Sequence, residues 1–199
     1  MLFRVIGPLE VTADGVVLPL GPRKQQSVLA LLALNAGRAV VLNDMIDELW
    51  GDDPPASAVP NIRGYAASLR RTLATAEPGR DRLVRTGSGY ALHTEIEDID
   101  LSMFSAQLLA GRDSLRHDDM KLASARFSEA LGMWHGPLLA GLPQGPLLAA
   151  RCASIEMTGC LPSRNSQGSC CDWTSLATPS HCYASTQSRT RCGSWDICC

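Results

Sequence analysis

The sequence predicts an α+β fold in which a short antiparallel sheet, three helices and a C-terminal hairpin precede an all-α segment. Three observations lead to this prediction. Short apolar runs flank Asp14-Gly15, a pair typical of hairpin turns. From residue 21 onward the apolar residues change to the three- and four-residue spacing of helices. Further along, two short apolar runs flank Gly87-Ser88-Gly89 and predict a second hairpin.

The first elements follow from these patterns. Residues 1–20 predict two or three short antiparallel strands. The helical spacing within residues 21–37 predicts a first helix, for which Asn35 and Gly37 supply the stop.

The next segment, residues 39–51, predicts a short strand followed by a second helix. Asn43 is the expected N-cap and Gly51 the expected C-terminal exit. Three residues are expected to face inward, with the tryptophan as a packing anchor: Ile46, Leu49 and Trp50.

Residues 59–79 predict a third helix with two contrasting faces. One face is an apolar stripe expected to be buried: Ile62, Tyr65, Ala66, Leu69 and Leu73. The rest of the helix combines the small residues Gly64 and Ala67 with arginines that have no acidic partner before Glu77. Two strands are expected next, at about 83–86 and 90–93. Arg80, Arg82 and Arg85 flank this hairpin, and Tyr90 is expected in the core.

Three helices followed by a basic hairpin are the order of a winged helix-turn-helix. In that arrangement the third helix enters a major groove, and the hairpin lies against the neighbouring backbone or minor groove. Guanidinium groups bind phosphate or guanine in a bidentate manner. An arginine-bearing helix face is more often simply solvated, so the order of elements, and no single residue, favours DNA binding.

Charge is distributed unevenly along the 199 residues, although the net charge is only −2. Residues 60–92 carry six Lys/Arg against two Asp/Glu, whereas residues 93–157 carry five against nine. A hydrophobic content of 45% indicates a soluble globular protein. The most apolar stretch, 28–34, is too short to span a bilayer, so we expect a cytoplasmic protein without a membrane partner. The expected DNA binding would make it nucleoid-associated.

Catalysis has little support in the sequence. The histidines His93, His117 and His135 are scattered, and neither a nucleophile elbow nor a phosphate-binding glycine loop is present before the first cysteine. We therefore predict a protein that is not an enzyme, with no catalytic residues and no cofactor. The serious alternative is a protein-interaction module that uses residues 95–150 and does not bind DNA.

All eight cysteines lie from Cys152 onward. Their only close spacings are two adjacent pairs, which do not fit zinc ligands, so no metal site is predicted. A disulfide framework conflicts with a cytoplasmic first half. Residues 158–199 hold thirteen Ser/Thr and no Glu or Lys, and they lack a sustained apolar period. We expect this Cys/Ser-rich tail to be disordered or to be the product of a shifted reading frame.

Several runs resemble the Streptomyces antibiotic regulatory protein family. They are "LFRVIGPLEV", "GPRKQQSVLALLALNAGRAV", "LNDMIDELWGDDPPASAVPNIRGYAASLRRTL" and "LVRTGSGYAL" within residues 1–92. The most specific pieces are "DELWGDDPPASA", "SLRR" and "GSGY". Residues 98–142 resemble the start of the family's helical activation domain, which consists of tetratricopeptide-like hairpins.

The resemblance implies an OmpR/PhoB-type winged helix, the output-domain type of two-component phosphorelays, over residues 1–93. Residues 94–157 would be a partial, truncated bacterial transcriptional activation domain. One and a half repeats would leave apolar side chains exposed, namely Phe104, Leu108, Leu109, Leu131 and Trp134. The implied protein activates antibiotic biosynthesis genes.

The resemblance also implies partners and DNA contacts. Two copies would bind direct repeats in double-stranded DNA as a homodimer and contact RNA polymerase through the segment "GDDPPASA" and the activation domain. The residues expected to meet DNA are Asn61, Arg63, Ala67, Ser68, Arg70 and Arg71 on the third helix, Arg82, Arg85 and Ser88 on the wing, and Arg23 and Lys24 at the start of the first helix.

Overall fold

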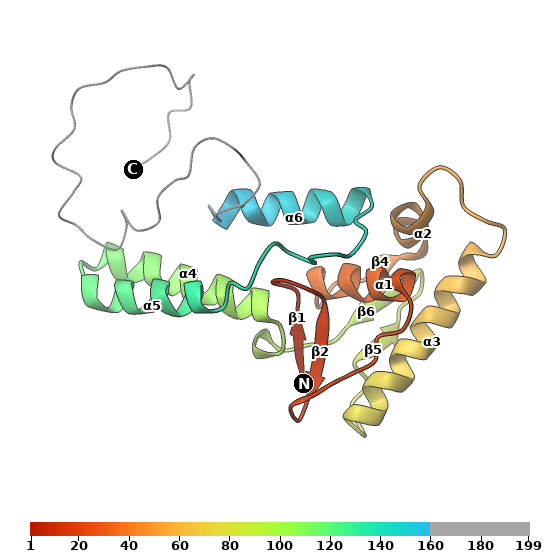
Figure 1. The fold of residues 1–199 in the computed structure, drawn as a ribbon, viewed down its shortest axis with the longest axis horizontal. Coiled ribbons are helices and arrows are strands. Elements are labelled where there is room, and N and C mark those ends of the chain that lie inside the picture. Colours follow the sequence, from red (N-terminus) through yellow and green to blue (C-terminus); the bar gives the residue numbers. More distant parts are fainter. Residues whose placement is uncertain (160–199) are drawn as a thin grey trace, which may run out of the picture. The chain divides into compact units, whose positions relative to one another are not determined.

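The first three strands form a small antiparallel sheet in the order β1-β2-β3. They are β1 (Leu2–Arg4), β2 (Glu10–Ala13) and β3 (Val16–Val17). The backbone φ angles of Asp14 and Gly15 are 50° and 80°, as a tight two-residue hairpin turn requires. The predicted hairpin is thus confirmed. The computed structural model describes residues 1–159, whose elements are shown in Figure 1.

Three helices follow: α1 (Arg23–Leu34), α2 (Leu42–Trp50) and α3 (Ala58–Ala76). Helix α1 lies in the middle of the core, with nine of its residues buried, and both α2 and α3 pack against it. It ends at Asn35, and Gly37 takes a positive φ of 74°, so the predicted stop is confirmed. The expected stripe on α3 is buried, apart from the half-buried Tyr65.

Helix α2 differs from the prediction at its start and on its buried face. Its N-cap residue is Val41 rather than Asn43, because strand β4 (Val40–Val41) leads directly into the helix. Met45 and Glu48 are the buried residues of α2. The three residues expected to face inward are only half-buried: Ile46, Leu49 and Trp50. The exit at Gly51, with a φ of 59°, is as predicted.

The second hairpin consists of β5 (Leu83–Arg85) and β6 (Gly89–Leu92), and the sheet has the order β4-β6-β5. Gly89 allows β4 to approach β6, because a Cβ atom at this position would lie 1.9 Å from the carbonyl oxygen of Val40. Tyr90 is buried with 5% exposure, which confirms its place in the core.

The helical segment begins with a short 3-10 turn, η1 (Ile96–Asp98), and contains α4 (Asp100–Arg116), α5 (Met120–Gly132) and α6 (Pro146–Gly159). Helices α4 and α5 lie side by side in Figure 1. Their close approach depends on Gly111, where a Cβ atom would lie 2.6 Å from Phe127 Cε1.

The expected exposure of apolar side chains in this segment is only partly correct. Phe104 and Leu108 are buried, with exposures of 3% and 6%; the ring of Trp134 lies against Phe104, and α5 packs along α4. Leu109 and Leu131 are exposed by 64% and 43%, as predicted, and Trp134 is half-buried.

Two buried carboxylates join the helical segment to the first three helices and strands. Asp100 accepts hydrogen bonds from the backbone N–H groups of Val5 (2.9 Å) and Ile6 (3.0 Å). Glu48 accepts three from the start of α6, donated by Gly145, Leu147 and Leu148 at 2.6, 2.9 and 3.0 Å. Residues 1–159 accordingly lie within one compact unit. The domain boundary at residues 93–94 stays a prediction.

Two further observations concern the described residues alone. No helix among them has the length and hydropathy needed to cross a bilayer. No group of three or more His, Cys, Asp or Glu residues within this range could hold a metal ion. The predicted state of the tail falls, from residue 160 onward, outside the described residues.

Candidate nucleic-acid interface

The solvent-facing side of α3 carries a line of cations. Arg63, Ala67 and Arg71 are four residues apart and all exposed, so they follow one another along the helix surface. Neither arginine has an ion pair with any described residue. The small side chain of Ala67 leaves the backbone between the two guanidinium groups accessible. This arrangement can bring two cations and a helix backbone to the same surface.

Arg70 has a different role from its two neighbours. It is half-buried, and its Nε donates a hydrogen bond of 2.9 Å to the carbonyl oxygen of Leu83. Leu83 begins β5, so this bond ties the hairpin to the side of α3. Arg70 therefore positions the wing, and its remaining N–H groups are less accessible than those of Arg63.

The tip of the wing presents Arg85 and Ser88, which are both exposed. Arg85 has no ion pair within the part of the chain that the structure describes. The Ser88 carbonyl accepts a hydrogen bond of 3.0 Å from the N–H of Leu42, the first residue of α2. The wing tip thus lies at the N-terminus of α2, where the helix dipole also favours an anion.

The expectation that Arg82 meets DNA from the wing is wrong. Its side chain is buried, with a residue exposure of 2%, and forms ion pairs with Glu77 (Nε to Oε2, 2.7 Å) and with Asp98. The hydrogen bond from Arg82 lowers the pKa of Glu77 below its ordinary value. Burial is the largest single influence on the pKa of Asp98 and raises it, but the hydrogen bonds from Arg82 and from the Glu95 N–H, with the charge of Arg82, together lower this pKa as well. Arg82 joins α3 to η1 and has no free face for phosphate.

Arg80 is also largely neutralised. Its guanidinium lies 3.4 Å from Glu77 and 3.0 Å from Glu95. The basic stretch of the sequence therefore has two parts in the folded chain. One part is a charge-balanced cluster under the hairpin, and the other is the exposed set Arg63, Arg71 and Arg85.

Asn61 and Ser68 lie on the flank of α3 that faces away from the wing. The Asn61 side chain donates to the Ser57 hydroxyl at 3.2 Å. Ser68 and Arg71 line a hollow of about 380 Å³ against Leu18 and Pro19, the segment that follows β3. Arg71 thus lies between the line of Arg63 and Ala67 and this hollow, whereas Ser68 lies on the hollow's side of α3.

Arg23 and Lys24 are exposed at the start of α1, but each contacts a residue outside α3 and the wing. Arg23 donates to the carbonyl oxygen of Gly141 at 3.4 Å. The Lys24 ammonium group lies 4.4 Å from the centroid of the Trp50 ring, a cation–π contact. Trp50 is half-buried rather than turned inward, and its ring contacts the Lys24 ammonium group. These two cations are anchored beside the α5–α6 connection and the end of α2.

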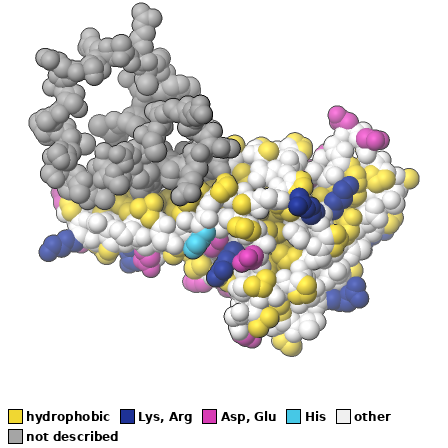
Figure 2. Space-filling model, viewed as in Figure 1, with side chains coloured by type: hydrophobic (Ala, Val, Ile, Leu, Met, Phe, Trp, Pro, Cys, Tyr) yellow, Lys and Arg dark blue, Asp and Glu magenta, His cyan; other side chains and the backbone are white. Residues whose placement is uncertain are grey.

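On the face of the molecule that Figure 2 draws, the basic side chains lie in separate groups, some of them beside acidic ones, and form no continuous basic patch. Specific contacts by a few arginines fit this distribution better than a broad electrostatic surface. An exposed basic helix and a basic hairpin on a three-helix core, followed by a helical segment, are the arrangement of a winged helix-turn-helix regulator.

Comparisons with known proteins agree with this class. Residues 99–160 match the family "Bacterial transcriptional activator domain". The regulatory protein AfsR of Streptomyces griseus is 34% identical over 144 residues, which are 72% of this chain and 14% of AfsR. The regulatory protein DnrI of Streptomyces peucetius is 32% identical over 162 residues, which are 78% of this chain and 60% of DnrI. The chain thus spans less than two thirds of either relative.

A solved structure is similar as well. EmbR of Mycobacterium tuberculosis, in complex with a low affinity phosphopeptide, has a TM-score of 0.74 and 32% identity, covering 79% of this chain and 42% of the EmbR chain. These similarities support a transcriptional regulator of the Streptomyces antibiotic regulatory protein family.

The sequence did not reveal the carboxylates that hold this arrangement together. Glu48 occurs three residues after the buried Met45, so helical spacing places it on the inward face of α2. That spacing is a usable signal for a buried acid, but it does not identify the partners, which are 97 to 100 residues away. Asp98 and Asp100 lie in an acidic stretch, where no spacing distinguishes a buried acid from an exposed one.

Proposed function

We propose that the protein binds specific sequences in double-stranded DNA and activates transcription. The observation that supports this most directly is the exposed set Arg63, Arg71 and Arg85, which has no ion-pair partners among the described residues. Helix α3 would enter a major groove, with Arg63 and Arg71 at bases or phosphates. Arg85 and Ser88 would contact the neighbouring backbone.

The finer features of the proposal rest on the similarity to these regulators. Two copies bind direct repeats near promoters of antibiotic or other secondary-metabolite genes, as a homodimer formed on DNA. The segment between α2 and α3, with the exposed Asp52 and Asp53, and the helical segment then contact RNA polymerase. The protein acts without catalysing a reaction, in the cytoplasm and at the nucleoid.

DNA binding is tested by fluorescence anisotropy with the full chain. Duplexes tiled from upstream of its own and neighbouring genes are titrated at two salt concentrations with nonspecific competitor. We expect saturable binding that prefers a fragment with direct repeats and weakens steeply with salt. Arg63→Ala should cost about 1–3 kcal/mol if it reads a base, and Arg85→Ala should lower the salt slope by about one unit.

Arg116→Ala is the matched control, because Arg116 is an exposed arginine near the end of α4 and far along the chain from α3. It should leave binding unchanged. Equal losses in Arg63→Ala and Arg116→Ala would show that only net charge matters. No binding to any duplex would instead favour a protein-interaction module, for which the exposed Leu109 and Leu131 provide apolar surface.

A further inference from the structure

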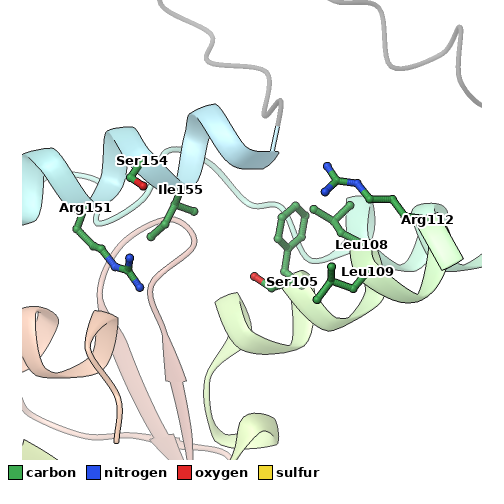
Figure 3. A pocket seen from close by; sticks show the side chains of 8 residues that line it. Ser105, Leu108, Leu109, Arg112, Arg151, Ser154 and Ile155 are labelled. Atoms are coloured by element: carbon green, nitrogen blue, oxygen red, sulfur yellow. The ribbon is translucent and has the colours of Figure 1, made fainter. Parts of the chain in front are cut away.

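A groove lies between α4 and α6, on elements that the proposed DNA contacts do not use. Its volume is about 260 Å³, and Figure 3 shows side chains from both helices directed into it. Phe104 and Leu108 form its buried floor on the α4 side. Leu109 contributes an edge that is 64% exposed, and Ile155 faces it from α6. An apolar hollow edged by an exposed leucine offers a surface on which the apolar side chains of a partner would be buried.

The charged residues of this groove all have the same sign. Arg112 stands on the α4 wall and Arg151 on the α6 wall, and both are exposed. No acidic residue is among those that line the groove. Arg151 has no ion pair with a described residue. An occupant that carries carboxylates beside an apolar stripe would match both properties of the groove.

Both walls are held in place by contacts elsewhere in the chain. The α4 wall is backed by the ring of Trp134, whose centroid lies 5.6 Å from that of Phe104. The α6 wall is fixed at its start by the three hydrogen bonds to Glu48. The groove is therefore formed before any partner arrives, which lowers the entropic cost of docking.

We propose that this groove binds an acidic amphipathic helix of another protein. Apolar residues spaced at i, i+3 or i+4, and i+7 would enter between Phe104, Leu109 and Ile155, and a flanking carboxylate would meet Arg151. The sequence beyond α6 does not provide such a segment, because residues 160–199 contain only two acidic residues, Asp172 and Asp196. This proposal does not depend on DNA binding.

The test uses the full chain and a fluorescent model peptide of about 16 residues, long enough for four helical turns. One peptide has a leucine stripe with glutamates elsewhere, and a second has lysines in place of all the glutamates. Binding is measured by anisotropy without DNA. We expect the acidic peptide to bind at least about tenfold more tightly than the basic one, and added salt to reduce this difference.

Variants locate the binding site. Arg151→Glu should weaken binding of the acidic peptide about fivefold or more. Leu109→Ala should weaken it about three- to tenfold. Two substitutions outside the groove should have no effect: Arg116→Glu, on the same helix as Arg112, and Leu131→Ala, an exposed leucine of α5. Circular dichroism confirms that each variant is folded.

Three outcomes would overturn the proposal. The two peptides bind equally, or Arg116→Glu costs as much as Arg151→Glu. Alternatively, sedimentation shows that the full chain self-associates and that Arg151→Glu abolishes the association, in which case a second copy is the occupant. Each of these leaves the DNA titration with Arg63→Ala unaffected, so failure of the groove and failure of the proposed function are distinguishable.

Discussion

Gly64 is the residue at which stability and function are expected to conflict. It lies in the middle of α3, it is exposed, and a Cβ atom there would meet nothing within 4 Å. The fold therefore does not need a glycine at this position, although glycine inside a helix costs about 0.5–1 kcal/mol relative to alanine. Close approach of the helix backbone to DNA would explain why the position is occupied by glycine.

We predict that Gly64→Ala raises the free energy of unfolding by about 0.5–1 kcal/mol and weakens DNA binding. Urea denaturation and the anisotropy titration measure the two effects. The control is Gly132→Ala at the end of α5, where a Cβ atom also meets nothing. It should leave DNA affinity unchanged. If Gly64→Ala binds DNA as tightly as the wild type, the backbone of α3 does not approach the duplex at this point.

The cluster around Arg82 gives the protein a predictable response to acid. Because Glu77 has a lowered pKa, its ion pair stabilises the fold above the ordinary value of 4.5, and this contribution is lost as the pH falls through the lower, folded-state pKa. Glu77→Gln should lower the free energy of unfolding at neutral pH by about 1–2 kcal/mol, since the buried Arg82 loses a partner. The wild-type and variant curves should converge below pH 4.5.

Urea denaturation from neutral to acid pH measures this convergence. Glu97→Gln is the control, because Glu97 is exposed and forms no ion pair with a described residue. Curves for Glu77→Gln and wild type that stay parallel would contradict the prediction.

Which arginines are available to a ligand was only partly predictable from the sequence. Spacing places Arg63 and Arg71 on the outer side of α3, and the structure agrees. Spacing does not reveal that Arg82 faces inward, because it lies just before the short strand β5, in a segment with no period that identifies its partners. Glu77 and Asp98 determine the outcome, and Asp98 is 16 residues away.

At the scale of elements, strong local patterns predicted the structure well. The hairpin at Asp14-Gly15, the end of α1 and the wing all rest on turn residues and periodicity. The start of α2 was predicted wrongly. Asn43 is a good capping residue locally, but the pairing of β4 with β6 sets the point where the helix begins. Tertiary pairing outweighs a local capping preference in this case.

The pairing of β4 with β6 leads to a prediction for the wing. Gly89→Ala would place a Cβ atom 1.9 Å from the Val40 carbonyl oxygen, which neither backbone can avoid without separating the strands. We expect a loss of at least about 2–3 kcal/mol in the free energy of unfolding. Gly87→Ala, in the same turn, meets nothing within 4 Å and should change stability little. Equal thermal stabilities of the two variants would contradict the proposed role of Gly89.

At the scale of the whole described chain, the helical segment and the preceding strands and helices are joined by hydrogen bonds to buried carboxylates. Asp100, from the helical segment, accepts the N–H groups of Val5 and Ile6, and Glu48, from α2, accepts those at the start of α6. Burial raises the pKa of Asp100 in spite of its hydrogen bonds from the backbone. Long sequence separation hides such contacts from any local pattern, so the sequence could predict the halves but not how they are joined.

The joint at Glu48 can be tested without disturbing the DNA-facing side. In Glu48→Gln the amide NH₂ group replaces one accepting oxygen, so at least one N–H at the start of α6 loses its partner. Such a loss costs about 1–3 kcal/mol, or about five- to 150-fold in the local opening equilibrium. Hydrogen exchange at Leu147 and Leu148 should accelerate by that factor, while amides of α1 keep their protection.

Asp47→Asn is the control, because Asp47 is the exposed acid beside Glu48 on the same helix. It should leave exchange at α6 unchanged. If α6 opens alone, the anisotropy titration with DNA should be unaffected while the acidic peptide loses affinity, since only the α6 wall of its groove is released. Wild-type exchange rates at Leu147 and Leu148 in Glu48→Gln would show instead that apolar contacts, such as that of the fully buried Leu148, hold α6 by themselves.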